Sequence, residues 1–468
     1  MDFRKITVTE LAARVSRQEL AAREVVAAAL ERIEALNPDV GAFVAVDPEA
    51  AMAEAAVIDE RIAQGEDVGP LAGVPLGVKD LEDAAGLVTT HGSAVHASDP
   101  PATDDSALVE RLRAAGCVVV GKTNTPELGW KPDTVNEVFG ATRNPWSLER
   151  SPGGSSGGSA AAIAAGMVPL ATGSDGGGSI RIPSSVCGLS GMKPSLGRVP
   201  QGGDDPPAWP GLSSKGVMAQ RIRDVTLALD VVVGPEATDL SSLPLPDASW
   251  SRSLAELNPP RKVGWSPTLG YAQADHEVLA VCEAAVQQLE DLGTEVVLID
   301  DVLGDDPVHD WMTLVGAYCL RSLGHLRDEA VWASIDPGLV AVMDWARASI
   351  SPAQLVEALD TCHRLNLIFV ELFHDVTLLL TPTVAGQTPR SGEQGTIDGE
   401  ADVNWVRFTY PFNMTRSPAG TVCAGFTADE MPVGLQVVGP QHADVAVLRL
   451  LAVLEDTLAI DRVAPLGP

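Results

Sequence analysis

Ser151-Pro-Gly-Gly-Ser-Ser-Gly-Gly-Ser159 and Gly173-Ser-Asp-Gly-Gly-Gly-Ser-Ile-Arg181 concentrate serine and glycine as no other part of this chain does. Glycine lacks a Cβ atom, so the backbone amides of such stretches can converge on one ligand atom. Serine hydroxyls set among these amides are candidate nucleophiles beside an oxyanion hole. None of the eight histidines lies in either stretch, so the base that activates a serine need not be histidine.

A flexible linker and a phosphate-binding loop are the two other interpretations of these stretches. Apolar runs at 160–165 and 167–171 separate the glycines and predict a helix followed by a buried strand, which a linker does not contain. No lysine follows Gly158 or Gly178 at the position that a phosphate-binding loop requires. The pattern therefore favours a catalytic loop.

Lys79 is the candidate base. It stands near the end of Leu71-Ala-Gly-Val-Pro-Leu-Gly-Val-Lys-Asp80, a mostly apolar run that is consistent with a buried strand. Burial disfavours the ammonium form and lowers the pKa of a lysine, and a neutral lysine is a competent general base. A structural pair between Lys79 and Asp80 at a strand end is the alternative, and the run alone leaves both open.

Several segments together resemble the amidase signature family. They are, in the family's order, Gly77-Val-Lys-Asp80, Gly121-Lys-Thr-Asn-Thr-Pro-Glu-Leu-Gly129, the two serine and glycine stretches, Cys187-Gly-Leu-Ser-Gly-Met-Lys-Pro194, Gly197-Arg-Val-Pro200, Leu379-Leu-Thr-Pro-Thr383 and Pro432-Val-Gly-Leu-Gln-Val-Val-Gly439. The resemblance runs from about Ile6 to Leu458, with the signature core at 71–200. The chain departs from the family's text within Thr415-Arg-Ser-Pro418, where a glycine often stands in place of Arg416.

The resemblance implies a Ser-cisSer-Lys triad. Ser179 corresponds to the nucleophile, and Lys79 corresponds to the base. Ser155 corresponds to the serine that relays a proton between them, and it follows a cis peptide bond from Gly154. The resemblance implies no metal and no organic cofactor.

The neighbours of the triad receive supporting roles from the same resemblance. The backbone N–H groups expected to bind the oxyanion are those of Gly176, Gly177, Gly178 and Ser179. Ser156 is expected to form a hydrogen bond within the triad, and Asp175 and Arg181 are expected to hold the glycine loop. Ser174 is given no role.

The activity that the resemblance implies is hydrolysis of a carboxamide C–N bond through an acyl-enzyme on serine. Arylamides, other acyl amides and carbamates (urethanes) all remain open as small-molecule substrates, and an esterase side activity does too. One alternative is the glutaminase-type A subunit of a tRNA-dependent amidotransferase, which works within a complex. Another is a catalytically silent scaffold on the same fold. The sequence leaves monomer and homodimer open.

Composition limits the other classes of function. The net charge of −31 argues against a nucleic-acid partner, because phosphate contacts require clustered lysine and arginine. No stretch approaches 18 uninterrupted apolar residues, so no membrane span is expected. The six cysteines are scattered and the first residues lack the apolar core of a signal peptide. These features predict a cytoplasmic enzyme.

Helical and extended patterns alternate along the chain. The strands are expected at 74–78, 118–121, 168–172, 262–265, 296–299, 377–380 and 434–438, and helices at 106–115, 157–165, 277–292 and 444–458. Capping boxes at Thr7 and Ser16 predict two helices near the N-terminus, the second ending near Leu36. The alternation predicts an α/β fold, in which a mixed, mostly parallel sheet is covered by helices on both faces.

The domain organisation expected from these patterns is one amidase domain over 1–468. A loop rich in proline, aspartate and serine is expected at 234–247. Residues 304–375 are expected to form a helical excursion at the substrate cleft. Aromatic residues in this excursion and near the family segments are candidates for the cleft wall, with core packing as the alternative: Trp130, Trp146, Trp209, Trp311, Tyr318, Trp332, Trp345 and the segment 405–410.

Overall fold

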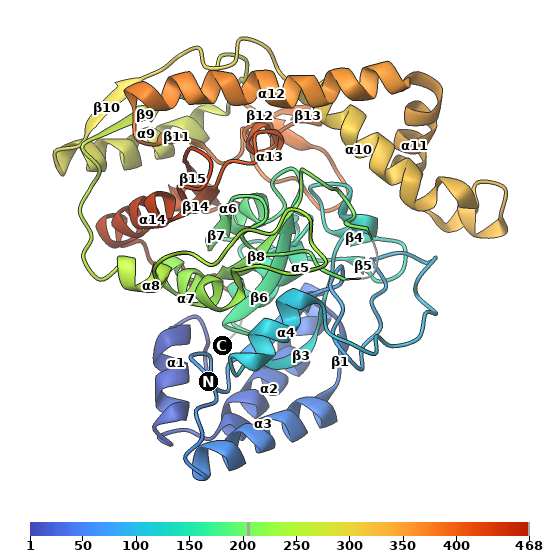
Figure 1. Cartoon of the computed structure of the whole chain (residues 1–468), viewed down its shortest axis with the longest axis vertical. Coiled ribbons are helices and arrows are strands. Elements are labelled where there is room, and N and C mark those ends of the chain that lie inside the picture. The colour runs from blue at the N-terminus through green and yellow to red at the C-terminus, as the bar shows by residue number, and fades with distance from the viewer. Residues whose placement is uncertain (204–205, 467–468) are drawn as a thin grey trace.

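A large mixed sheet forms the centre of the computed structural model, which describes residues 1–203 and 206–466 (Figure 1). In sheet order its strands are β1 (Phe43–Val46), β3 (Val118–Thr123), β2 (Pro75–Lys79), β6 (Leu170–Asp175), β8 (Ser214–Ala219), β7 (Ser190–Lys193), β14 (Ala419–Phe426), β15 (Pro432–Val438), β11 (Leu379–Pro382), β9 (Lys262–Trp265) and β10 (Glu295–Leu298). Two small ladders lie apart from it, β4 (Val135–Asn136) with β5 (Gly140–Ala141) and β12 (Gly395–Ile397) with β13 (Glu400–Asp402).

Helices pack against this sheet, for example α2 and α3 against β3, and α9 and α14 against β14. Their bounds are α1 (Val8–Ser16), α2 (Ala22–Val40), α3 (Pro48–Ala63), α4 (Ala107–Ala114), α5 (Gly157–Ala164), α6 (Arg181–Val186), α7 (Ile222–Val232), α8 (Trp250–Ser253), α9 (His276–Asp291), α10 (Val308–Leu323), α11 (Pro337–Ser349), α12 (Pro352–Asp375), α13 (Pro411–Met414) and α14 (Asp444–Leu458). The predicted α/β class is confirmed.

The strand directions differ in detail from the mostly parallel sheet that the alternation predicts. Strand β2 runs parallel to β3 and β6, and β9 runs parallel to β10 and β11. The other neighbours in the sheet are antiparallel. Strands β14 and β15 show the reason, because they follow one another through a short turn, and a short turn can only join antiparallel neighbours.

The two predicted capping boxes have different outcomes. Thr7 caps α1 as predicted, since its side chain accepts a hydrogen bond from the backbone N–H of Glu10. The prediction at Ser16 is wrong, because Ser16 is the last residue of α1. Helix α2 starts only at Ala22, contains Pro38 and ends at Val40. Gly41 caps it with a positive φ of 65°, which suits a glycine just after a helix.

Residues 304–375 contain α10, α11 and α12. Two short 3₁₀ turns lie between α10 and α11. Helix α12 crosses the top of the molecule in Figure 1, and α10 and α11 lie beside it. These helices form a second hydrophobic cluster around Leu314, Leu339 and Met343, which also includes Trp209, Leu212 and Met414 from other parts of the chain. The loop predicted at 234–247 lies between α7 and α8 and contains neither helix nor strand.

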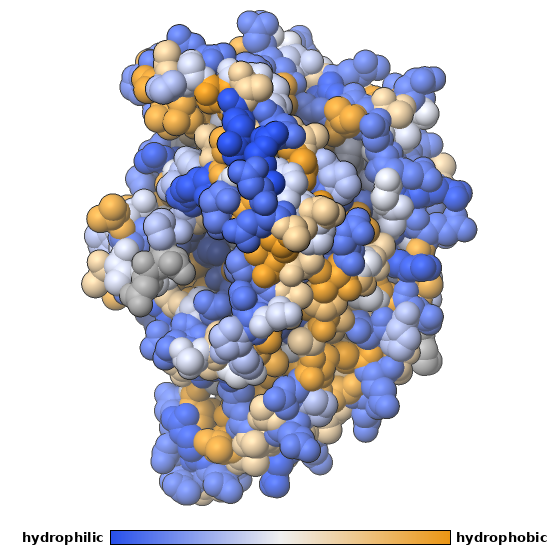
Figure 2. Space-filling model, turned by 90° about the vertical axis from the view of Figure 1, so that its right-hand side faces the viewer, coloured by the Kyte–Doolittle hydropathy of each residue, from blue (hydrophilic) through white to orange (hydrophobic). Residues whose placement is uncertain are grey.

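The surface mixes hydrophilic and hydrophobic residues. Figure 2 shows one face, where hydrophilic residues cover most of the margin and hydrophobic residues gather in a band near the middle. Among the described residues, no helix combines the length and the apolar character that a membrane crossing requires. All six cysteines are free thiols, and all but Cys362 are buried.

Candidate active site

Lys79 stands at the end of β2 with its side chain completely buried. Its Nζ atom is hydrogen-bonded to three hydroxyl groups, Ser155 Oγ at 2.7 Å and Ser156 and Ser174 Oγ each at 2.9 Å. Protonated lysine has three donors and no acceptor, whereas the neutral amine has two N–H groups and one lone pair. In the neutral form one hydroxyl can therefore donate to Lys79, and Ser155 is the nearest.

Electrostatics favour this neutral form. Burial lowers the pKa of Lys79 to about 7, and the cation of Lys215 adds to the effect, although Glu82 and Asp175 act in the opposite direction. The alternative of a Lys79–Asp80 pair is wrong, because Asp80 pairs with the buried Lys122 at 3.1 Å. Lys79 thus remains without a carboxylate in contact and can exchange protons with hydroxyls.

Ser155 and Ser156 follow the cis peptide bond between Gly154 and Ser155, which is present as the resemblance implies. A Cβ atom at Gly154 would lie 2.8 Å from the backbone nitrogen of Asp133, so the neighbouring chain leaves room only for glycine. The backbone N–H of Ser156 donates to the carbonyl of Ser179 at 3.2 Å. This bond joins the two serine and glycine stretches, and it brings all three predicted triad residues into one site.

Ser174 belongs to the same cluster, which the sequence analysis did not predict. It lies on β6, two residues after Thr172, whose Oγ1 accepts a hydrogen bond from the backbone N–H of Lys79 at 2.8 Å. Residues two apart on a strand share one face of the sheet, so both hydroxyls face β2 and its lysine. This alternation along β6 was the signal in the sequence that could have identified Ser174.

Residues 176–178, here called the glycine loop, follow β6 and lie between two tryptophan side chains. A Cβ atom at Gly176 would lie 2.5 Å from the indole of Trp209, and one at Gly177 would lie 2.4 Å from the indole of Trp311. Only glycine fits at such an approach. The indole N–H of Trp311 also donates to the carbonyl of Gly176 at 3.1 Å, which fixes the loop from the side of α10.

The N–H groups of this loop are not equally available. Gly178 N–H already donates to Asp175 Oδ1 at 2.8 Å, so the prediction of a free oxyanion donor at Gly178 conflicts with the structure. Within residues 1–203 and 206–466, the N–H groups of Gly176, Gly177 and Ser179 have no protein acceptor. These three N–H groups can bind an anionic oxygen without breaking an existing bond.

Asp175 and Arg181 hold the loop from its buried side, and both side chains are fully buried. Arg181 donates to Asp175 through Nε at 2.9 Å and Nη2 at 2.8 Å, and also to the side chains of Gln436 and Asn413. Burial alone would raise the pKa of Asp175, but the Arg181 guanidinium holds that pKa well below its ordinary value. A buried, bidentate ion pair of this kind fixes geometry, because leaving either charge unpaired is costly.

Ser179 lies on the wall between two cavities. Almost every residue from 151 to 200 is buried, and Gly177 and Ser179 are among the few that are partly exposed. The polar cavity, about 280 Å³, is lined by Leu81, His91, His96, Leu128, Gly129, Ser155, Ser174, Gly176, Ser179, Gln201, Pro206, Ala208, Trp209, Ser213, Lys215, Cys319, Arg321 and Ser322. The apolar cavity, about 360 Å³, is lined by Gly129, Trp130, Lys131, Pro132, Gly177, Ser179, Ile182, Trp209, Val308, Trp311, Met312, Val315, Val342, Val403, Asn404, Val406 and Tyr410.

The aromatic candidates divide between these cavities and other places. Trp130, Trp209, Trp311 and Tyr410 line the apolar cavity, with the rings of Trp311 and Tyr410 stacked at 5.2 Å. Trp146 instead packs against Phe426 and donates to the carbonyl of Cys187. Tyr318, Trp332, Trp345 and Trp405 line neither cavity.

Known proteins resemble this chain over almost its whole length. The family model described as Amidase matches residues 24–448. An acylamidase of Rhodococcus erythropolis is 36% identical over 473 residues, which covers 96% of this chain and 95% of that protein. A bacterial aryl acylamidase of the amidase signature enzymes superposes with a TM-score of 0.91 at 29% identity, over 98% of this chain and 99% of that one. A 6-aminohexanoate cyclic dimer hydrolase superposes with a TM-score of 0.88 at 30% identity, over 98% of each chain.

Proposed function

This chain belongs to the amidase signature family, and we propose that Ser179, Ser155 and Lys79 are its nucleophile, proton relay and base. The enzyme hydrolyses the C–N bond of amides. That reaction requires attack on a carbonyl carbon and protonation of a leaving nitrogen, because an amide anion is a very poor leaving group. The proposed residues have to perform both steps.

In the first step, neutral Lys79 takes a proton from Ser155 Oγ, and Ser155 takes the proton of Ser179 Oγ as it attacks the carbonyl carbon. The hydrogen bond of 2.7 Å between Lys79 and Ser155 supports the first transfer. The lowered pKa of Lys79, about 7, supports a neutral amine near neutral pH. The oxyanion that forms would accept hydrogen bonds from the N–H groups of Gly176, Gly177 and Ser179.

In the second step, Ser155 gives its proton to the leaving nitrogen and takes one back from the Lys79 ammonium, and the C–N bond breaks to release the amine. Water then attacks the acyl-enzyme, and the same relay removes a proton from that water. The carboxylic acid leaves and Ser179 regains its proton. Every proton in this cycle passes through Ser155, with Lys79 as the base behind it, so the proposed relay needs no further acid or base.

The observation that carries the substrate assignment is the position of Ser179 on the walls of both cavities. Ser155 lines the polar cavity, and it is absent from the lining of the apolar cavity as the structure describes it. The leaving nitrogen must lie within reach of Ser155, so the amine half would occupy the polar cavity. The acyl half would then occupy the apolar cavity beside Trp130, Trp209 and Trp311.

We therefore propose that this amidase prefers amides with an apolar acyl group, aliphatic or aromatic. An aryl amine is compatible with the polar cavity, since the side chains of Leu81, Leu128 and Trp209 contribute apolar surface there. Among the described residues, the guanidinium of Arg321 in the same wall donates to the backbone carbonyls of Pro207 and Ala208.

A panel of anilides tests this assignment. From acetanilide to hexananilide, kcat/KM is expected to rise by roughly threefold for each methylene that the apolar cavity buries. Phenyl carbamates and L-glutamine complete the panel. A higher kcat/KM for acetanilide than for hexananilide would contradict the acyl assignment, and efficient glutamine hydrolysis would favour the amidotransferase alternative.

A further inference from the structure

A third cavity of about 340 Å³, here called the distal cavity, borders the same chain segment as the catalytic cavities. Trp209 and Ser213 line the catalytic cavities, whereas residues 210–212 between them line the distal cavity. Helix α10 is shared in the same way, with Trp311 toward the catalytic side and Tyr318 toward the distal side. None of the residues of the proposed relay lines the distal cavity.

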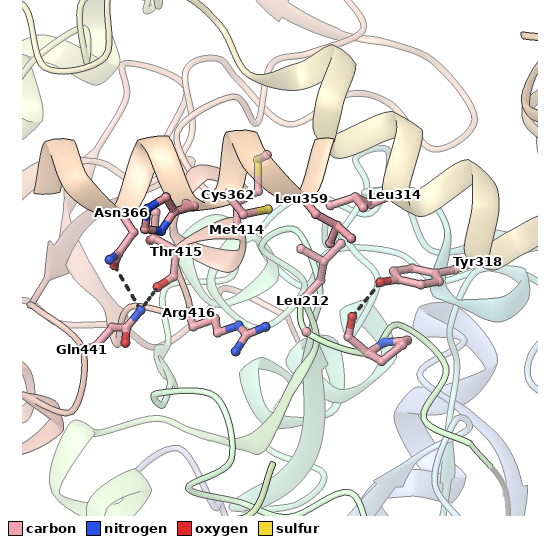
Figure 3. A pocket seen from close by; sticks show the side chains of 13 residues that line it. Leu212, Leu314, Tyr318, Leu359, Cys362, Asn366, Met414, Thr415, Arg416 and Gln441 are labelled. Carbon is pink, nitrogen blue, oxygen red and sulfur yellow. Dashed lines mark hydrogen bonds between the residues drawn. The ribbon is translucent and has the colours of Figure 1, made fainter. Parts of the chain in front are cut away.

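One part of the distal cavity is apolar. Leu212 and Met414 are buried there, and Leu314 on α10 and Leu359 on α12 add two more aliphatic side chains to the wall (Figure 3). This wall offers an aliphatic chain or an aryl ring a place out of water, which is where most of the binding free energy of small apolar groups originates.

The other part presents one charge. Of the lining residues, all of which the structure describes, Arg416 alone carries a permanent charge, and its guanidinium points into the space below α12 in Figure 3. No carboxylate lines the cavity, and in the described part of the chain Arg416 forms no ion pair. A cation without a neighbouring carboxylate is unusual in a chain with a net charge of −31.

Two of the other donors that line the cavity are already used. The side-chain nitrogen of Gln441 donates to Asn366 at 3.1 Å and to the carbonyl of Thr415 at 2.7 Å. The hydroxyl of Tyr318 donates to the carbonyl of Pro210 at 2.7 Å. A ligand would therefore meet a guanidinium with free N–H groups beside apolar side chains, and a planar carboxylate is the group that guanidinium binds best.

The backbone of Arg416 strengthens this interpretation. Its φ of 60° lies in the left-handed region, where residues other than glycine are strained. An ideal Cβ at Gly211 would lie 3.4 Å from Arg416 Nη2, so the guanidinium lies against the shared segment 210–212. The strain is compatible with a side chain whose charge has a use in this position.

We propose that the distal cavity binds a monocarboxylate with an apolar aliphatic or aryl group, held by Arg416. Hydrolysis of an amide releases one carboxylic acid and one amine, so the enzyme's own acid product belongs to this class. A carboxylate bound here lies against the back of the segment whose Trp209 faces the catalytic cavities. The site requires only that the enzyme hydrolyses amides, and it does not depend on the roles proposed for Ser179, Ser155 and Lys79.

Isothermal titration with hexanoate, and with hexan-1-ol as the uncharged probe, tests the site in enzyme labelled with a fluorophosphonate, which blocks the catalytic cavities against the same probes. In Arg416→Gly the affinity for hexanoate is expected to fall by roughly 10- to 100-fold, the range for losing a charge-assisted hydrogen-bonded pair. Hexan-1-ol should bind weakly and equally to both proteins. Arg416→Lys keeps the positive charge and should retain part of the affinity, whereas the glycine variant relieves the strained φ and should fold.

Leu359→Glu gives a second test that leaves Arg416 in place. Leu359 is 51% exposed on α12, where a glutamate is tolerated by the helix, and the new carboxylate would repel the ligand. Hexanoate affinity should fall in this variant too, while thermal melting confirms folding. Equal hexanoate affinity in the parent, Arg416→Gly and Leu359→Glu would overturn the proposal, as would hexan-1-ol binding as tightly as hexanoate.

Discussion

Residues 151–200 and residues 304–375 both border the catalytic cavities, but they are built in opposite ways. In the first region nearly every side chain is buried, and Gly177, Ser179 and Arg198 are the exceptions. The second region consists of amphipathic helices with many exposed positions, and it forms the second hydrophobic cluster together with residues from other parts of the chain. With the roles proposed above, the first region would hold the reacting serines in place, whereas the second places apolar side chains beside Ser179.

The two regions meet at the glycine loop, and this contact explains the division of labour. Trp311 of α10 lies against Gly177 and donates its indole N–H to Gly176, while Asp175 and Arg181 hold the loop from the buried side. The buried side therefore fixes the N–H groups that would meet an oxyanion. With the substrate oriented as proposed, the helical side would determine which acyl group fits beside them. Variants in the two regions should differ in kind as well as in size.

The largest effect is expected for Ser179→Ala in the buried region. Loss of the nucleophile should reduce kcat for hexananilide by at least about 10⁴-fold, because the covalent route disappears. A fluorophosphonate probe should label the parent protein and spare this variant, as measured by intact mass. Ser213→Ala, which alters another serine of the polar cavity, should keep the label. A labelled Ser179→Ala protein would show that the nucleophile lies elsewhere.

A loss of similar kind is expected for the two residues of the relay. Lys79→Met, which keeps most of the buried stem, and Ser155→Ala should each lower kcat by roughly 10³-fold or more. Groups that pass one proton act as a unit, so the double variant should be hardly slower than either single one. Steady-state kinetics on all three proteins measures this. Losses that multiply would mean that the two residues act in separate steps.

A smaller and selective effect is expected in the helical region. Trp311→Ala should lower kcat/KM for hexananilide by roughly 10- to 200-fold, the range for apolar pocket contacts. Acetanilide, which does not reach the indole, should change much less. Trp332→Ala, in the same region but away from both cavities, is the matched control and should leave both substrates unaffected. Equal losses for the long and short anilides would assign Trp311 to support of the glycine loop.

The sequence predicts the buried region well because its chemistry is local. Lys79 ends an apolar run, Ser155 and Ser179 stand among glycines, and each of these features survives in the structure as a strand end or a tight loop. Seven of the eleven strands of the sheet follow for the same reason, since buried strands are short apolar runs, whereas β1, β7, β8 and β14 were not predicted. Their directions do not follow, because pairing joins segments far apart in the chain.

Three details could not be predicted, and each depends on tertiary contact. The N–H of Gly178 is used by Asp175, which only the folded loop reveals. The helical region contains Trp311 and Tyr318 on one helix, yet the two rings face different cavities, and helical periodicity does not say what covers each face. Ser16 is a residue type that often caps the start of a helix, but here it is the last residue of α1.

The smallest effect, a shift of the pH profile, comes from Lys215 on β8. Lys215 faces Ser174 across the β6–β8 ladder and pairs with Glu82, so its cation lies near Lys79. In the proposed mechanism the neutral form of Lys79 is the base, so kcat/KM for a small uncharged amide should fall as the pH drops below about 7 and level off above it.

In Lys215→Met a cation that disfavours the ammonium form of Lys79 is gone, and the carboxylate of Glu82, which favours that form, remains. The loss of the cation, with Glu82 left in place, raises the pKa of Lys79. The acid limb of kcat/KM should therefore move to higher pH, by about one unit or less. Combining Lys215→Met with Glu82→Gln removes both charges and should return the limb toward its original position. An acid limb that stays in place, or moves to lower pH, in Lys215→Met would mean that the profile reports a group other than Lys79. Because Lys215 also lines the polar cavity, the midpoint of the limb, and not the height of the plateau, is the quantity that decides between these outcomes.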